Sequence, residues 1–127
     1  MEILVICLII SALLPFIAKA PVAIAMNKLG GYDNNQPRAQ QAKLTDFGAR
    51  ALAAHQNAFE SFVIFAPAVV LAISLGKTGT MMEYLAIGHV IARILYNLLY
   101  LIDRSTERSI VWFIGITCTF LIYFNLI

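Results

Sequence analysis

Charged residues and cysteines are scarce in this chain, and both shortages narrow the classes of protein to which it can belong. Only 13% of the 127 residues are charged, and a net charge of +2 is too small to indicate a nucleic-acid partner. The two cysteines, Cys7 and Cys118, lie inside apolar runs with no CxxC pair and no metal-ligand spacing. We therefore interpret them as small buried hydrophobic residues and predict no metal site. No Cys-His or Ser-His-Asp arrangement indicates a hydrolase.

Hydrophobic residues, in contrast, are abundant, at 61% of the chain. Soluble domains usually contain about 45–50%. The apolar runs are continuous rather than alternating, which favours helices over barrel strands, and the length allows roughly four spans of about 20 residues. The first residues, "MEILVICLIISALLPF", lack a basic leading segment and predict a spanning helix rather than a cleaved signal. The expected fold is an all-α integral membrane protein, with residues 1–127 as one four-transmembrane-helix bundle.

Polar and turn-forming residues divide the chain into its expected elements. The predicted spans are 3–26, 46–75, 81–102 and 108–127. Pro15, Pro21 and Pro67 predict bends inside the first two spans, and Thr45 or Asp46 could cap the second. The segment 27–47 reads as a turn-rich loop because it contains Gly-Gly, Asn-Asn and a proline.

Four spans place both termini and the turn at 76–80 on one side of the membrane. That side carries one basic residue near the membrane, Lys77. The other side carries six, namely Lys28, Arg38, Lys43, Arg50, Arg104 and Arg108. The positive-inside rule therefore predicts that the connections 27–47 and 103–107 are cytoplasmic and that both termini lie outside.

Two of the expected helices carry polar residues on one face. At 100° per residue, Arg50, Asn57 and Glu60 fall within one sector of the second helix, whereas His55 points well away from it. On the third helix, the residues spaced 4, 4 and 3 apart form a polar stripe, His89, Arg93, Asn97 and Tyr100.

Arg93 is the most informative of these polar residues because it sits near the middle of the third helix. An arginine at that depth costs about 2.5–3.5 kcal/mol or more unless it is paired or hydrated. Glu60 is the expected partner, as the only acid well inside the second helix. One interpretation is a purely structural ion pair. The other is that these groups also line a polar cavity for a partly buried anionic ligand, with Arg104 and Arg108 at its cytoplasmic mouth.

Three segments, "YDNNQPRAQ", "RALAAHQNAFESF" and "ARILYNLLYLIDRSTERS", resemble the family of membrane-associated proteins in eicosanoid and glutathione metabolism (MAPEG). The resemblance extends from about Tyr32 to Ser109 and is greatest to the short bacterial branch. It implies a homotrimer with four spans per subunit in the bacterial inner membrane. It also implies glutathione as co-substrate, bound at subunit interfaces near the cytoplasmic side.

The resemblance also implies a set of site residues. The residues that match the family's glutathione ligands are Arg50, His55, Asn57, Glu60, Arg93 and Tyr100. Arg108 and Ser109 match the catalytic pair near the thiol. The orientation of His55 away from Glu60 fits a trimer in which one helix contributes to two different environments.

Such a site would bring a thiolate to lipophilic electrophiles or hydroperoxides that dissolve in membrane lipid. A guanidinium favours the charged form of a thiol, and the start of a helix favours an anion, so Arg108 suits this task. Ser109 could donate a hydrogen bond to the same sulfur. The expected function is thus a membrane-bound glutathione-dependent transferase or peroxidase.

A non-catalytic protein on the same scaffold is the alternative, either an accessory subunit of a larger membrane complex or a lipid-binding trimer. Gln56 stands where the eicosanoid-synthesising members often carry a basic residue, and Trp112 stands where a tyrosine is common. In this interpretation Arg108 only anchors the helix at the interface, and Tyr100 and Trp112 are belt aromatics. A transporter is a weaker third class because four spans without repeat symmetry provide little machinery.

Overall fold

The computed structural model describes all residues from Met1 to Ile127 as five α-helices without strands. Four of them are long and apolar enough to cross a membrane: α1 (Glu2–Asn27), α3 (Asp46–Ser74), α4 (Thr80–Leu101) and α5 (Ser105–Phe124). The short helix α2 (Pro37–Gln41) lies in the long polar connection. The predicted all-helical fold with four spans is confirmed.

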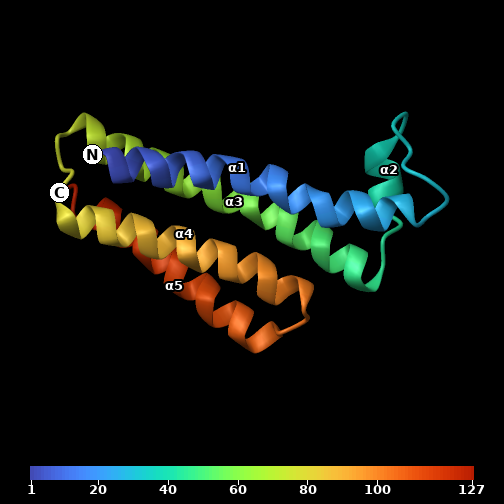
Figure 1. Ribbon diagram of the computed structural model, residues 1–127. Helices are drawn as coiled ribbons and strands as arrows, with labels where there is room; N and C mark the ends of the chain where they lie inside the picture. The colour runs from blue at the N-terminus through green and yellow to red at the C-terminus, as the bar shows by residue number, and fades with distance from the viewer.

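The four long helices form two antiparallel hairpins, α1 with α3 and α4 with α5, which diverge towards the end that carries α2 (Figure 1). Both termini and the α3–α4 turn lie at the opposite end. There the amino group of Met1 is 3.0 Å from Glu83 Oε1, and Lys77 Nζ donates to the carbonyl of Leu126 over 2.8 Å. The structure confirms that the termini and this turn share one side.

Two tight turns of the same type reverse the chain after α3 and after α4. Gly76 and Asp103 adopt left-handed φ angles of 68° and 60°, and the next N–H reaches back to Ala72 and Leu99 respectively. This is the Schellman arrangement, in which such a residue ends a helix and satisfies its last carbonyls. Because the turn at Asp103 is so compact, α5 begins at Ser105 rather than at the predicted residue 108.

The connection between α1 and α3 is more ordered than the loop predicted for 27–47. Pro37 starts α2, where its fixed φ and missing N–H are tolerated. Gln40 then ties the loop together: its Nε2 donates to the Gly31 carbonyl (2.7 Å), and its Oε1 accepts from Asp33 N–H (2.9 Å). Thr45 precedes α3, but its side chain makes no capping hydrogen bond.

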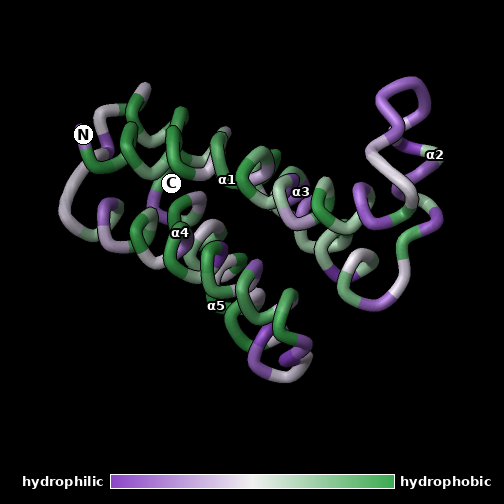
Figure 2. Tube along the Cα trace, turned by 45° about the vertical axis from the view of Figure 1, so that its right-hand side comes forward, coloured by the Kyte–Doolittle hydropathy of each residue, from purple (hydrophilic) through white to green (hydrophobic).

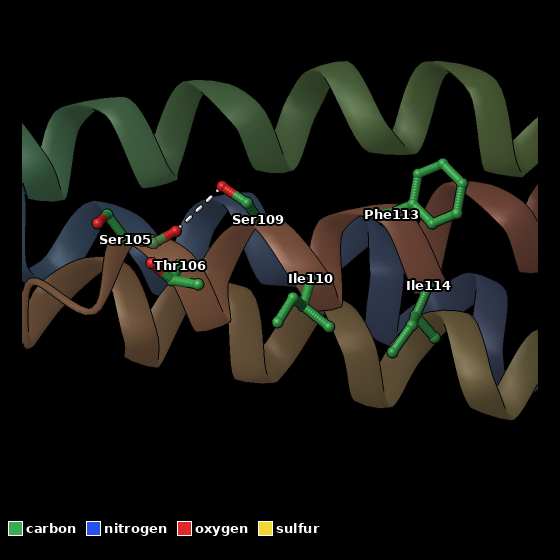
Figure 3. A pocket seen from close by; sticks show the side chains of 6 residues that line it. All are labelled: Ser105, Thr106, Ser109, Ile110, Phe113 and Ile114. Carbon is green, nitrogen blue, oxygen red and sulfur yellow. Dashed lines mark hydrogen bonds between the residues drawn. The ribbon is translucent and has the colours of Figure 1, made fainter.

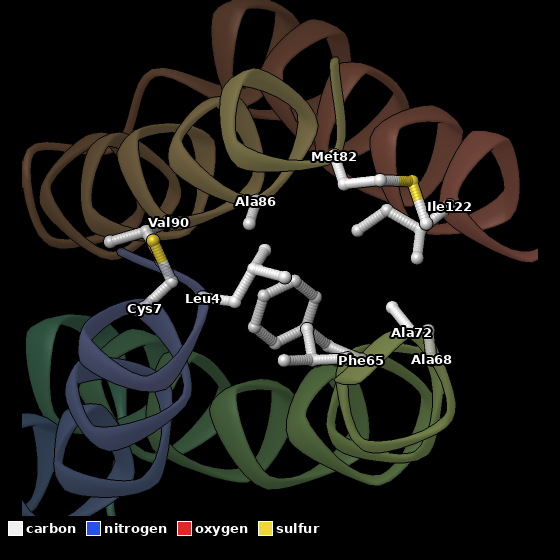
Figure 4. Packing of buried hydrophobic residues seen from close by; sticks show 10 residues of the cluster. Leu4, Cys7, Phe65, Ala68, Ala72, Met82, Ala86, Val90 and Ile122 are labelled. Carbon is white, nitrogen blue, oxygen red and sulfur yellow. The ribbon is translucent and has the colours of Figure 1, made fainter. Parts of the chain in front are cut away.

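The main core lies where the hairpins converge and is centred on Phe65, which is fully buried (Figure 4). Ala68 and Ala72 of α3 and Ala86 of α4 are small residues of the same cluster, which allows the two helices to pack closely beside this ring. A smaller cluster of Val22, Met26 and Ala51 joins α1 and α3 towards the other end. The hydrophilic segments gather at α2 and at the α4–α5 turn, which lie at the end of the bundle away from the main core (Figure 2).

The contact between α4 and α5 depends on Gly115, which gives the first prediction. A Cβ atom there would lie 3.3 Å from Ala92 Cβ and 3.6 Å from Arg93 Cδ. We expect Gly115→Val to lower the free energy of unfolding by about 1–3 kcal/mol through overpacking, measured by thermal unfolding in detergent. Thr117→Val, at an exposed position of the same helix, is the control. Equal stability of the two variants would contradict the close approach.

Candidate functional site

The centre of the candidate site is a bridge from α4 to α3 built on Asn57. The buried Arg93 donates from Nη2 to Asn57 Oδ1, and Asn57 Nδ2 donates to Glu60 Oε2 over 3.1 Å. Arg93 is 4% exposed. The predicted direct ion pair between Arg93 and Glu60 is therefore wrong. The amide of Asn57 intervenes because it can accept from the guanidinium and donate to the carboxylate at once.

Aromatic side chains continue this bridge along α4 towards α5. The guanidinium of Arg93 lies 4.2 Å from the ring centre of Tyr96, and that of Arg108 lies 4.0 Å from the ring centre of Tyr100. The two tyrosine rings contact each other edge to face, with centres 5.5 Å apart. Cation–π contacts of this kind stabilise a charge without neutralising it. The structure thus joins Arg93, Tyr100 and Arg108 in one row.

Arg50 belongs to the same face of α3 as Asn57. The contact between Asn57 and Arg93 sets the register of the antiparallel helices α3 and α4. Arg50 precedes Asn57 by seven residues, about two turns of helix, so it lies on the same face of α3, nearer to the start of that helix. The Nε atoms of Arg50 and Arg93 are both buried and have no hydrogen-bond partner.

The site is positively charged because its arginines have no paired carboxylate. The chain contains two ion pairs, Met1 with Glu83 and Arg104 with Glu107. The second is an exposed contact of 2.6 Å within one turn, in which hydrogen bonding to Glu107 raises the pKa of Arg104. Arg104 is thus neutralised locally, whereas the arginines of the site lack an acid within 4 Å, namely Arg50, Arg93 and Arg108.

Below Arg93, a chamber of about 110 Å³ opens between α3, α4 and α5. Its floor is His89, which is 2% exposed and stacks on Phe65 with ring centres 3.9 Å apart. His89 Nδ1 faces the Gly115 carbonyl (3.1 Å) and Thr119 Oγ1 (2.9 Å), while Nε2 is 3.4 Å from Ser61 Oγ. A carbonyl only accepts, so Nδ1 carries a hydrogen and can donate it to Gly115, while Nε2 faces Ser61 and the chamber.

His55, predicted as a glutathione ligand, lies on the other face of α3 from this site. Its Nδ1 is 2.7 Å from the Pro15 carbonyl of α1, and its ring contacts Phe59 edge to face. The predicted divergence of His55 from Asn57 and Glu60 is confirmed. Within one chain, His55 is not brought together with the other predicted ligands.

Ser109 is likewise separated from Arg108, although the two are adjacent in sequence. Its hydroxyl donates to the Ser105 carbonyl over 3.0 Å (Figure 3). It lines an open cavity of about 590 Å³ on the outer side of α5, with hydroxyls of Ser105 and Thr106 at one end and Ile110 and Phe113 further along. Successive residues of a helix point about 100° apart, so Arg108 faces α4 while Ser109 faces away from it.

Sequence reasoning missed several residues of the chamber wall. Ser61 and Thr119 are single hydroxyls inside apolar runs, and no spacing connects them in the sequence. The only sequence feature that could have indicated them is the polar stripe on the third predicted span. His89 lies at the end of this stripe and, as a buried polar residue, needs hydrogen-bond partners from the facing helices. Trp112, the only tryptophan of the chain, also lines the chamber rather than serving only as an interfacial aromatic.

Comparison with known proteins gives one match, which covers almost the whole chain. The family model described as the MAPEG family matches residues 3–127. No curated protein and no solved structure matches the chain.

The bridging geometry predicts which double substitution rescues Arg93→Leu. That variant leaves Asn57 Oδ1 without its donor, and Asn57→Leu leaves Arg93 without its acceptor. We expect each single variant to lose about 1.5–3 kcal/mol, because the lost hydrogen bond involves a charged group. In thermal unfolding, Arg93→Leu/Asn57→Leu should recover more stability than Arg93→Leu/Glu60→Leu. Greater recovery in Arg93→Leu/Glu60→Leu would instead support a direct ion pair between Arg93 and Glu60. The control is Gln56→Leu, because Gln56 is exposed.

Proposed function

Because the chain belongs to the MAPEG family and is an integral membrane protein, we propose that it is a glutathione-dependent transferase or peroxidase acting on lipophilic electrophiles or hydroperoxides. The observation that carries this proposal is the set of three arginines without a paired carboxylate, Arg50, Arg93 and Arg108. Arg93 is buried in the spanning part of the bundle, where an unpaired charge is costly and marks a site of ligand binding or transport, and Arg50 and Arg108 belong to the basic end of the same bundle. An anionic ligand would supply the missing negative charge.

Glutathione has the charges that this face requires. Its two carboxylates match Arg50 and Arg93, whose free Nε–H groups can each donate to an oxygen. Its ammonium group matches Glu60, which Asn57 holds in place. Tyr100 would border the ligand beside Arg108. We propose that the protein is a homotrimer, in which His55 serves the site of a neighbouring subunit because it faces away from this one.

Arg108 is proposed as the group that activates the thiol. A guanidinium beside the sulfur favours the thiolate, and the start of α5 adds the positive end of a helix dipole. The ring of Tyr100 holds Arg108 in position without consuming its charge. The thiol releases its proton to water at the basic end, and the thiolate sulfur then bonds to the electrophilic atom while the leaving group departs with its electron pair. Ser109, the second predicted catalytic residue, keeps its hydrogen on the Ser105 carbonyl on the other side of α5, so within one chain the activation is assigned to Arg108 alone.

The basic end of the bundle is proposed to face the cytoplasm of a bacterium, with the protein in the inner membrane. Of the seven basic residues near the two membrane surfaces, six lie in the parts of the sequence that form this end of the bundle. The positive-inside rule assigns such a surplus of basic residues to the cytoplasmic side. In this orientation, 27–47 and 103–107 are cytoplasmic and both termini lie outside. Glutathione would then enter from the water and the lipophilic substrate from the bilayer.

A non-catalytic role is the second candidate, as an accessory subunit of a larger membrane complex or as a lipid-binding trimer. The observation that favours it is the orientation of Ser109, whose hydroxyl is bonded to the backbone on the side away from Arg108. In this role Arg108 would anchor α5 at the interface through Tyr100. The next experiment separates the two candidates.

Replacing Arg108 should impair thiolate formation more than stability. Losing one charge-assisted hydrogen bond would raise the pKa of the bound thiol by about one to two units. Arg108→Ala should therefore lose most of the ultraviolet thiolate signal that glutathione gives at neutral pH, together with conjugation of an aryl halide. Ser109→Ala should lose less because its hydroxyl is bonded to the Ser105 carbonyl.

The control for this experiment is Arg104→Ala, at the same end of the bundle but already paired with Glu107. It should keep both signals. Binding is followed separately through the fluorescence of Trp112, which borders Asn57 and Glu60 in the chamber. Binding by the wild type without thiolate or conjugation would contradict the catalytic proposal and favour the non-catalytic one.

The proposed trimer is tested independently by native mass spectrometry from mild detergent. We expect the wild type to show the mass of three chains with bound glutathione. In Arg50→Ala, which removes one of the unpaired arginines, the glutathione should be lost. A clean monomer that still binds glutathione would show that one chain forms the whole site and that His55 has no part in it.

A further inference from the structure

The polar chamber between α3, α4 and α5 has the size and the wall chemistry of a site for ordered water. Its volume is about 110 Å³. A water molecule occupies roughly 30 Å³ in the liquid, so the chamber has room for about three. Apolar cavities stay dry, whereas polar walls retain water. Polar residues make up five of the eight that line this chamber, namely Asn57, Glu60, Ser61, His89 and Thr119.

Glu60 is the group in the chamber wall that most needs water. It lies at the middle of α3, where a carboxylate must be paired or hydrated. Its only hydrogen bond within the chain comes from Asn57 Nδ2, at 3.1 Å to Oε2. A carboxylate can accept about four such bonds. Waters in the chamber would supply donors for the remaining positions.

His89 is held so that one of its nitrogens faces the same space. Its ring stacks on Phe65 with centres 3.9 Å apart, and its Nδ1 lies 3.1 Å from the Gly115 carbonyl. Its Nε2 is 3.4 Å from Ser61 Oγ, which is long for a hydrogen bond between a hydroxyl and a ring nitrogen. A water in the chamber can bond to both groups at normal length.

From this arrangement we infer that the chamber binds ordered waters through which Ser61 and His89 orient the carboxylate of Glu60. Both are positioning residues, because they act on Glu60 through water. The inference rests on the proposed function in one respect, since the oriented carboxylate would receive the ammonium group of glutathione. An acceptor fixed in advance loses less freedom on binding, so it favours the ligand that carries an ammonium group.

Trp112 reports on water in the chamber without any ligand, because it lines the chamber and is the only tryptophan of the chain. Contact with water moves indole emission to longer wavelength and makes its intensity rise when heavy water replaces water. We expect the purified protein to show both effects, and Ser61→Ala and His89→Asn to weaken them. Thr117→Val is the control and should match the wild type, since Thr117 lies on the same helix but does not line the chamber.

The positioning role is tested with two thiols, glutathione and an analogue in which hydrogen replaces the amino group. The ratio of their affinities measures the contact of Glu60 with the ammonium group. Ser61→Ala should lower this preference about three- to tenfold, as for the loss of one hydrogen bond, with little change in affinity for the analogue. In Glu60→Gln, which removes the charge, adding Ser61→Ala should change the preference no further, because Ser61 acts through Glu60.

Two substitutions of His89 separate its packing from its part in the chamber. An asparagine amide occupies the place of Nδ1, so His89→Asn can keep the bond to the Gly115 carbonyl but loses the nitrogen that faces Ser61. A glutamine amide occupies the place of Nε2, so His89→Gln keeps a polar group towards Ser61. Both variants lose the stacking on Phe65. We expect His89→Asn to lower the preference as Ser61→Ala does, and His89→Gln to preserve most of it.

Three results would overturn the inference. The first is wild-type Trp112 emission that heavy water leaves unchanged, which would mean a dry chamber. The second is an equal loss of affinity for both thiols in Ser61→Ala, which would mean a general disturbance of the bundle. The third is the same preference in His89→Asn and His89→Gln, which would mean that His89 only packs. A wild type that binds neither thiol but keeps the heavy-water effect would instead reject the proposed function and support the hydrated chamber.

Discussion

The structure depends on the way a guanidinium is accommodated in the middle of an apolar bundle. Arg93 is nearly inaccessible, yet it has no carboxylate beside it. One side-chain amide and one aromatic ring stabilise it, so its hydrogen-bonding needs are partly met while its charge persists. A direct ion pair would have cancelled that charge and left a closed structural element. The amide bridge instead leaves a positive site with free donors, which is the condition for binding an anion.

The divergence of the two helical hairpins follows from the same constraint. Small and apolar side chains bring α3 and α4 together around Phe65 at one end. Towards the other end the facing residues include Asn57 and Arg93, which cannot be packed as an apolar core. The polar chamber above His89 lies at the transition between these two regions. Packing around Phe65 thus sets where the bundle is closed, and the polar chamber marks where that packing ends.

Helix α3 presents two different chemical faces. Asn57 contacts Arg93 of α4, and Asn57 and Glu60 line the chamber between α3, α4 and α5. His55 faces the backbone of α1 and a cavity beneath α2. A helix of 3.6 residues per turn separates positions 55 and 57 by about 200°, so two neighbouring polar residues serve different environments. The two faces of α3 therefore present different polar groups to their surroundings.

The sequence by itself determined the four spans, the common side of the termini and the shared face of Arg50, Asn57 and Glu60. These features depend on hydrophobic runs and helical periodicity, which are local. It could not determine that Asn57 stands between Arg93 and Glu60, or that Ser61 and Thr119 complete the surroundings of His89. Those contacts join residues about 30 positions apart, and their distances depend on the register between helices. Only the tertiary structure decided them, because packing fixes that register and periodicity does not.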